Sequence, residues 1–211
     1  LDLILAMDGG HLRDVRRQAA GPDAAAELRA VLERGLPTII DADALTVLST
    51  DGDLRELVRD HPCAVLTPHA GEFERLYAAT LDRKLDLSEG LGVRLRELSD
   101  ALDCFILHKG RITTVMAPGQ KIYGMNAGHS YAATAGSGDV LSGILGATLA
   151  QLDAAEADAE AIIMEILHAG AIHQHAAAIA AHTPDGFGLC SASQIAAAVP
   201  QAIARLLVMQ R

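Results

Sequence analysis

Positive charge is scarce in this chain of 211 residues, which has 17 Lys and Arg against 27 Asp and Glu and a formal net charge of −10. An acidic surface argues against nucleic acid or an anionic membrane as the main partner. It does not exclude a small anionic ligand, because backbone N–H groups at the start of a helix bind phosphate whatever the net charge.

Cysteine and long hydrophobic runs are also scarce. Cys63, Cys104 and Cys190 are widely separated and form no Cys-x-x-Cys motif, which predicts reduced, packed thiols in a cytoplasmic protein. The alanine-rich C-terminal third is interrupted by His, Gln, Asp and Glu, so no run reaches the length of a membrane-spanning helix.

Hydrophobic residues nevertheless make up 50% of the chain and charged residues 21%, a balance typical of one globular α/β domain over residues 1–211. Apolar, β-branched runs alternate with helical patterns, and PGQK at 118–121 is typical of a hairpin turn. This order predicts a mostly parallel sheet with a local hairpin and helices on both faces. We expect strands at 1–7, 38–40, 63–67, 104–109 and 112–117, and helices at 23–34, 71 onward, 88–102, 138–151, 156–181 and 191–207.

Polar residues gather where the expected strands end, which is where ligands bind in open α/β sheets. These residues are Asp41, Asp43, Thr67, His69, Glu72, Lys109 and Asn126.

The segment TAGSGDVLSG, residues 134–143, combines two glycines with the start of an expected helix. Gly136 and Gly138 permit close approach of a ligand, and the free N–H groups of a first helical turn attract phosphate. Asp139 in that turn is placed to act as a general base on a bound hydroxyl. The alternative is a simple helix start in which Ser137 or Asp139 only caps.

Three other segments allow both a functional and a structural interpretation. In LTPHAGEFERL (66–76), Pro68 ends the strand and presents His69 as a ligand contact or as a surface histidine. In DADAL (41–45), Asp43 holds Mg²⁺ through water or caps the next helix. In HKGRIT (108–113), Lys109 meets a phosphate or belongs to an ordinary turn.

The histidines of HAGAIHQHAAAIAAH (168–182) do not have the spacing of a metal site. His168 and His175 share a helix face, whereas His173 and His175 do not. We therefore expect histidines on a helix face or at a nucleotide edge and no zinc.

Taken in order, DADAL, LTPHAGEFERL, HKGRITTVMAPG, NAGHSYAATAGSGDVLSGILGATLAQ and LHAGA resemble the ADP/ATP-dependent NAD(P)H-hydrate dehydratases, a branch of the ribokinase-like fold. The resemblance covers residues 36–180 well. It implies an α/β/α three-layer architecture that lacks the family's N-terminal part here, and a homotetramer. Ala70 stands where the family usually has proline, and AMDGGHL where it has a glycine-rich turn.

The resemblance also implies an activity, the removal of water from the hydrated nicotinamide ring of NADHX or NADPHX with ADP or ATP as co-substrate and Mg²⁺. Asp139 would be the base, and Gly136, Ser137 and Gly138 the anion hole. The further residues implied are His69 and Gly10 for the substrate; Lys109, Gly110, Arg111, Ile112, Thr113 and Gly138 for the nucleotide; and Asp43, Asn126 and Glu72 for further ligand or Mg²⁺ contacts.

Three alternatives stay open at this point. A ribokinase-like kinase of a small vitamin-type alcohol shares the Gly-x-Gly-Asp anion hole, and an inactive relative would bind nucleotide without turnover. An assembly module would explain the alanine-rich helices but not Asp139.

Overall fold

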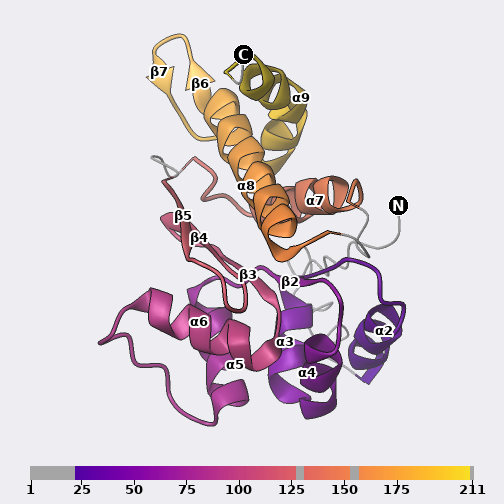
Figure 1. Ribbon diagram of the computed structural model, residues 1–211. Helices are drawn as coiled ribbons and strands as arrows, with labels where there is room; N and C mark the ends of the chain where they lie inside the picture. Colours follow the sequence, from indigo (N-terminus) through magenta and orange to yellow (C-terminus); the bar gives the residue numbers. More distant parts are fainter. Residues whose placement is uncertain (1–21, 127–130, 153–156, 210–211) are drawn as a thin grey trace.

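The computed structural model describes residues 22–126, 131–152 and 157–209 (Figure 1). The strand expected at 1–7, and Gly10, which the resemblance implies as a substrate contact, lie outside these residues. The main sheet has the order β1 (Thr38–Ile40), β2 (Ala64–Leu66), β3 (Phe105–His108), β4 (Ile112–Met116) and β5 (Tyr123–Asn126).

The strand directions confirm a mostly parallel sheet with a local hairpin. Strands β1, β2 and β3 pair in parallel, while β4 is antiparallel to both β3 and β5. Among these five strands β4 alone therefore runs in the opposite direction. The turn at 118–121 connects β4 to β5, as expected from PGQK.

Helices cover both faces of the sheet because neighbouring residues of each strand point to opposite sides. Ile40, Leu66 and Ile106 are buried with the helices on one face. That layer comprises α2 (Pro22–Leu32), α3 (Asp43–Thr50), α4 (Gly52–Arg59), α5 (Ala70–Leu81) and α6 (Leu91–Leu102).

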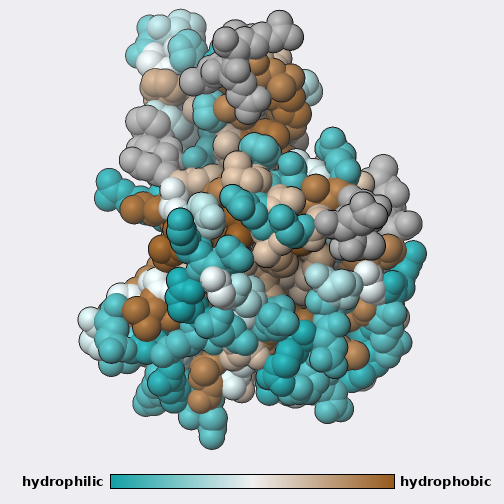
Figure 2. Space-filling model, viewed as in Figure 1, coloured by the Kyte–Doolittle hydropathy of each residue, from teal (hydrophilic) through white to brown (hydrophobic). Residues whose placement is uncertain are grey.

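The opposite layer packs on the alternate strand residues, among them Ile39, Val65 and Leu107. It is formed by α7 (Ser137–Leu149) and α8 (Ala159–Ala181), against which α9 (Ala192–Met209) packs in turn. The three layers, helix, sheet and helix, are visible in Figure 1. Figure 2 shows hydrophilic residues over α4 to α6 and hydrophobic residues gathered over α8 and α9.

Two elements were missed by sequence analysis. Helix α4 is capped by Asp51, whose side chain accepts a hydrogen bond from the backbone N–H of Leu54. A short hairpin, β6 (His182–Thr183) and β7 (Gly186–Phe187), separates α8 from α9, where the sequence predicts only helices. In both cases a local cap or turn, and not the hydrophobic period, defines the element.

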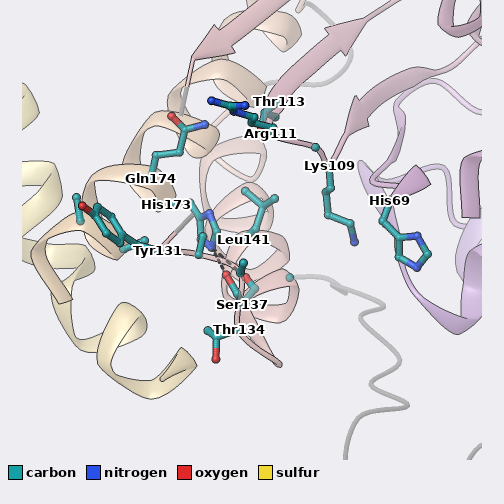
Figure 3. A pocket seen from close by; sticks show the side chains of 16 residues that line it. His69, Lys109, Arg111, Thr113, Tyr131, Thr134, Ser137, Leu141, His173 and Gln174 are labelled. Carbon is teal, nitrogen blue, oxygen red and sulfur yellow. Dashed lines mark hydrogen bonds between the residues drawn. The ribbon is translucent and has the colours of Figure 1, made fainter. Parts of the chain in front are cut away.

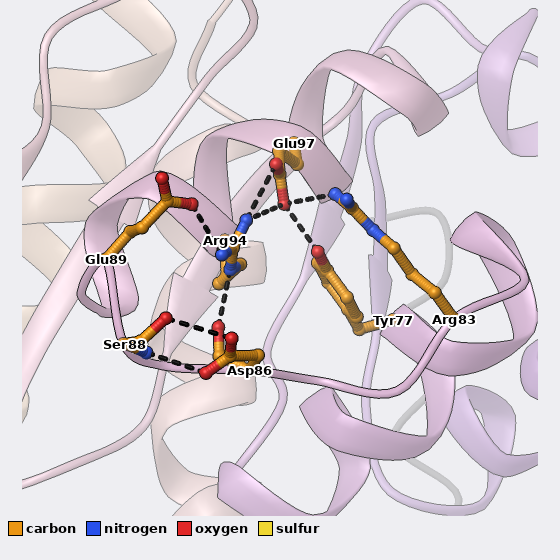
Figure 4. A network of polar contacts seen from close by, with 7 residues as sticks. All are labelled: Tyr77, Arg83, Asp86, Ser88, Glu89, Arg94 and Glu97. Carbon is orange, nitrogen blue, oxygen red and sulfur yellow. Dashed lines mark hydrogen bonds and ion pairs between the residues drawn. The ribbon is translucent and has the colours of Figure 1, made fainter.

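A polar network around Glu97 stabilises the connection between α5 and α6 (Figure 4). The Glu97 carboxylate accepts hydrogen bonds from Tyr77 and Arg94 and pairs with Arg83 at 2.7 Å. These contacts, the Tyr77 bond above all, lower the pKa of Glu97 to about 2. Arg94 also donates to the backbone carbonyl of Asp86, which attaches the connecting loop to α6.

The three cysteines were expected to be reduced and packed in the interior. All three cysteines are free and buried, and burial raises the pKa of Cys63 to about 11. Within the described ranges, no helix combines the length and the hydrophobicity needed to cross a bilayer.

Candidate functional site

A cleft of about 970 Å³ opens at the carboxyl ends of β2 and β3, beside the first turn of α7 (Figure 3). It therefore brings together segments that lie far apart in the sequence, as the strand-end argument predicts. Its lining consists of His69, Lys109, Gly110, Arg111, Thr113, Tyr131, Ala132, Ala133, Thr134, Ser137, Gly138, Leu141, His173, Gln174, Ala177 and Ala178.

The first turn of α7 is an open helix start. Gly136 precedes it with φ of 81°, a left-handed conformation that glycine adopts without strain, and no side chain among the described residues caps the helix. The N–H of Ser137 donates to the backbone carbonyl of Thr134 at 3.2 Å. An added Cβ at Gly136 would also lie 3.2 Å from the Cβ of Ala192. Because uncapped N–H groups and the helix dipole favour negative charge, this turn is suited to an anion.

Lys109 adds a full positive charge at this helix start. Its Nζ lies 2.5 Å from Oδ1 of Asp41 and 3.7 Å from the position that a Cβ on Gly138 would occupy. The Asp41 side chain is only 3% exposed and the Lys109 side chain 24%. Lys109 is therefore held by a buried carboxylate while part of its surface faces the cleft.

Asp41 is held in turn by two further donors. The hydroxyl of Ser142 in α7 donates to Oδ2 at 3.0 Å, and the backbone N–H of Ala42 donates to Oδ1 at 2.9 Å. Ala42 itself has φ of 51°, a conformation that costs a non-glycine residue energy and is concentrated at functional sites. Ser142 of α7 thus helps to hold Asp41, the partner of Lys109, in place.

His69 lies beside Lys109, with which it forms an isolated parallel bridge, and it caps α5. Its Nδ1 accepts from the N–H groups of Gly71 at 3.0 Å and Glu72 at 3.3 Å. Nδ1 is therefore used as an acceptor in this cap. The side chain is 56% exposed, so its edge is accessible to a ligand.

Glu72 completes a reciprocal cap on α5. Its Oε2 accepts from the backbone N–H of His69 at 2.8 Å, and its Oε1 lies 3.3 Å from the His69 ring. A backbone bond from Lys109 to the carbonyl of Pro68, 2.8 Å long, joins this turn to the end of β3. Both carboxylate oxygens of Glu72 are thus engaged by His69.

His173 enters the cleft from α8 and contacts the start of α7. Its Nε2 lies 2.9 Å from Oγ and 3.0 Å from the carbonyl oxygen of Ser137. Burial lowers the pKa of His173 below its ordinary value, so the ring is neutral near pH 7. Among the expected helix-face or nucleotide-edge histidines, this is the one at the cleft.

Other predicted residues are not among those that line the cleft. Asp139 is half-buried in the first turn of α7, with Oδ2 3.8 Å from a Cβ position on Gly136. Ile112 is 56% exposed on β4 and pairs through its backbone with Asn126 at the end of β5. Asp43 begins α3, and its buried Oδ2 has no hydrogen-bond partner among the described residues.

The residues 22–126, 131–152 and 157–209 contain no group of three His, Cys, Asp or Glu side chains that could hold a metal ion. Asp41 is occupied by Lys109, so the unpartnered oxygen of Asp43 is a single candidate donor. These residues do not fit a resident Mg²⁺ site formed by protein ligands alone.

An α/β/α domain with helices on both faces of a mostly parallel sheet belongs to the doubly wound class, in which ligands bind at the carboxyl edge of the sheet. The family model described as NAD(P)H-hydrate dehydratase matches residues 19–196. The chain belongs to this family.

Known proteins support the same assignment. The chain is 40% identical over 198 residues to the bifunctional NAD(P)H-hydrate repair enzyme Nnr of Corynebacterium glutamicum, covering 86% of this chain and 34% of that protein. It thus spans about a third of that relative's length.

Solved structures share the fold. A ribokinase-like superfamily protein of Enterococcus faecalis aligns with a TM-score of 0.64 at 24% identity, over 88% of this chain and 59% of that one. The ADP/ATP-dependent NAD(P)H-hydrate dehydratase of Bacillus subtilis, co-crystallized with ATP/Mg²⁺, aligns with a TM-score of 0.56 at 22% identity, over 80% and 55%. The predicted ribokinase-like architecture is confirmed.

Proposed function

We propose that this chain carries the dehydratase activity for which its family is named, the conversion of NADHX or NADPHX to NADH or NADPH with ADP or ATP as co-substrate. The observation that best supports the proposal is the Lys109 ammonium beside the uncapped first turn of α7, in a cleft of about 970 Å³. A nucleotide phosphate is the ligand that such a turn and such a charge favour.

The chemistry follows from the poor leaving ability of a hydroxyl group. Transfer of a phosphoryl group from the nucleotide to the hydroxyl of the hydrated ring converts it into a good leaving group. Departure of the phosphate, together with loss of a proton from the neighbouring ring carbon, restores the double bond of the reduced nicotinamide. Such transfers depend on positioning and on electrostatic stabilisation of the phosphoryl oxygens. Gly136, Ser137, Gly138 and Lys109 are suited to that role.

Asp139 is the proposed base that takes the proton of the hydrate hydroxyl. It lies in the first turn of α7, next to the residues proposed for the anion hole. A general base must reach its proton directly or through one water, so the reacting hydroxyl would sit beside that turn.

The remaining proposals follow the edges of the cleft. The segment Lys109–Thr113 holds the adenine nucleotide, with Arg111 supplying a second positive charge from the lining. His69 offers its exposed ring edge to the hydrated dinucleotide. Mg²⁺ would accompany the nucleotide phosphates, since Mg²⁺ is commonly bound through one or two carboxylates and the substrate's phosphates. A cytoplasmic homotetramer remains our prediction from composition and resemblance.

The decisive experiment supplies the intact protein with NADHX and ADP or ATP and follows the absorbance of NADH. We expect NADH to return, and Asp139→Asn to lower the rate at least about 100-fold with nucleotide binding retained. Asp53→Asn is the matched control, because Asp53 occupies the first turn of α4 and is exposed. Full activity of Asp139→Asn would refute the role of this base.

The competing function is phosphorylation of a small alcohol, which the same anion hole would support. It is favoured if no NADH returns while a pyrimidine or thiazole alcohol is phosphorylated. Nucleotide-dependent thermal stabilisation without either reaction would indicate an inactive relative.

A further inference from the structure

His173 and Ser137 form a contact between two helices that the proposed reaction does not explain. They are 36 positions apart, and His173 is 8% exposed. One ring nitrogen, Nε2, lies within hydrogen-bond distance of both the hydroxyl and the carbonyl oxygen of Ser137. Figure 3 shows both bonds at the edge of the cleft.

The chemistry of the carbonyl group decides where the proton lies. A carbonyl oxygen only accepts, so Nε2 of His173 must be the donor in the bond to Ser137. The same N–H is then shared with the Ser137 hydroxyl oxygen, which accepts. The proton of that hydroxyl is consequently not used in the contact with His173, and Ser137 lines the cleft.

The bond to the carbonyl also constrains the neighbouring N–H. The peptide group that joins Ser137 to Gly138 is planar, and the structure contains no cis peptide bond among the residues it describes. In a trans peptide the carbonyl and the N–H point in opposite directions. By holding the carbonyl of Ser137, His173 therefore fixes the direction of the Gly138 N–H at the open start of α7.

We propose that His173 is a positioning residue, which orients the Ser137 hydroxyl and the Gly138 N–H as paired donors to a phosphate oxygen of the adenine nucleotide. The inference rests on the proposed function, because it assigns the nucleotide to this helix start. The site residues that the resemblance implies include none of α8, and His173 adds one.

The neutral state of His173 suits this role. Burial lowers the pKa of its imidazole, so the ring near pH 7 donates from Nε2 without bringing a second full charge beside Lys109. The positive charge at the site is then carried by Lys109, whose partner Asp41 is fixed. His173 thus orients the hydrogen-bond donors, and Lys109 supplies the positive charge.

The test is calorimetric titration of ADP into the intact protein, four single variants and one double variant, His173→Leu with Ser137→Ala. His173→Leu keeps most of the volume and removes the donor, whereas His173→Gln keeps an N–H donor. Ser137→Ala removes the hydroxyl. His175→Ala is the control, because His175 lies on the same helix and its Nδ1 lies 2.9 Å from the carbonyl oxygen of Ala171, within α8.

We expect His173→Leu and Ser137→Ala each to weaken ADP binding about 10-fold, the effect of losing one hydrogen bond to a charged group. Their combination should weaken it less than the product of the two, because the residues act as a unit. His173→Gln should bind ADP within about threefold of the parent, because it keeps an N–H donor. His175→Ala should bind as the parent does.

Equal affinity of His173→Leu and the parent would overturn the proposal, as would equal losses in His173→Leu and His173→Gln. Titration also separates the two inferences. A parent that binds ADP but returns no NADH from NADHX refutes the dehydratase function and leaves the positioning role to be judged by the variants. A parent that does not bind ADP refutes both.

Discussion

Two helix starts face each other across the same cleft, and one is closed while the other is open. Helix α5 begins with His69 and Glu72, which satisfy each other's backbone N–H groups in a reciprocal cap. Helix α7 begins after Gly136 with no side-chain cap and with Lys109 nearby. A capped start needs no ligand, whereas an uncapped start beside a cation is stabilised by an anion.

The difference comes from short sequence signals. In HAGE, residues 69–72, the glutamate lies three positions after the capping residue, which is the spacing of a capping box. In GSGD, residues 136–139, a glycine takes the capping position and the acid follows in the first turn. Two short segments that each contain a glycine and an acid thus give a capped helix start in one case and, in the other, an uncapped start that we propose binds the nucleotide.

The largest effect should come from removing the charge at the open start. Lys109→Met leaves the buried Asp41 unpaired, and we expect the free energy of unfolding to fall by about 3 kcal/mol. ADP affinity should fall about 10- to 100-fold, since a charged contact is lost. Denaturant titration and calorimetry measure the two effects.

Two further variants separate charge from stability at Lys109. Combining Lys109→Met with Asp41→Asn should recover more than half of the lost stability but none of the affinity, because the unpaired charge is gone and the cation is still missing. Lys121→Met is the control at an exposed lysine. Unchanged ADP affinity in Lys109→Met would remove the cation from the proposed site.

An intermediate effect is expected at the closed start. Glu72→Ala breaks the reciprocal cap and should lower stability by about 1 kcal/mol, while ADP affinity stays at the parental value. Glu74→Ala is the control, since Glu74 is exposed in the same helix. If affinity falls together with stability, Glu72 contacts the ligand, as the resemblance implies, and the contrast between the two helix starts fails.

The smallest effect concerns pH and the histidine at the open start. Burial lowers the pKa of His173 from its ordinary 6.5, so below that pH the unfolded chain binds a proton that the folded chain does not. Stability should therefore decline as pH falls below about 6.5. His173→Gln should reduce this slope without abolishing it, because burial lowers the pKa of His61 and His108 as well. An unchanged slope in thermal unfolding between pH 7 and 5 would contradict this assignment.

Much of the fold could be predicted because its signals are local. The β-branched runs, the hairpin turn and the glycine-aspartate segment each lie within about ten residues, and polar residues at strand ends pointed to one edge of the sheet. Helix α4 and the β6–β7 hairpin were missed because a single capping aspartate and a two-residue turn outweigh periodicity there.

The contacts that shape the site could not be predicted in the same way. Lys109 and Asp41 are 68 positions apart, and Ser142 and Asp41 are 101 apart. Each pair meets only once the sheet has formed and α7 has packed on it. His173 was visible as one of several histidines on a helix, and only its burial against Ser137 distinguishes it from His168 and His175.

The backbone bond from Lys109 to the carbonyl of Pro68 has a consequence for how this family can diversify. It ties the closed start of α5 to the end of β3 through main-chain atoms, which every amino acid carries. The relative placement of His69 and Lys109 on this wall of the cleft is therefore set by the scaffold and not by their side chains. Substitutions of those side chains can then alter which molecule is selected while the backbone of this wall keeps its position.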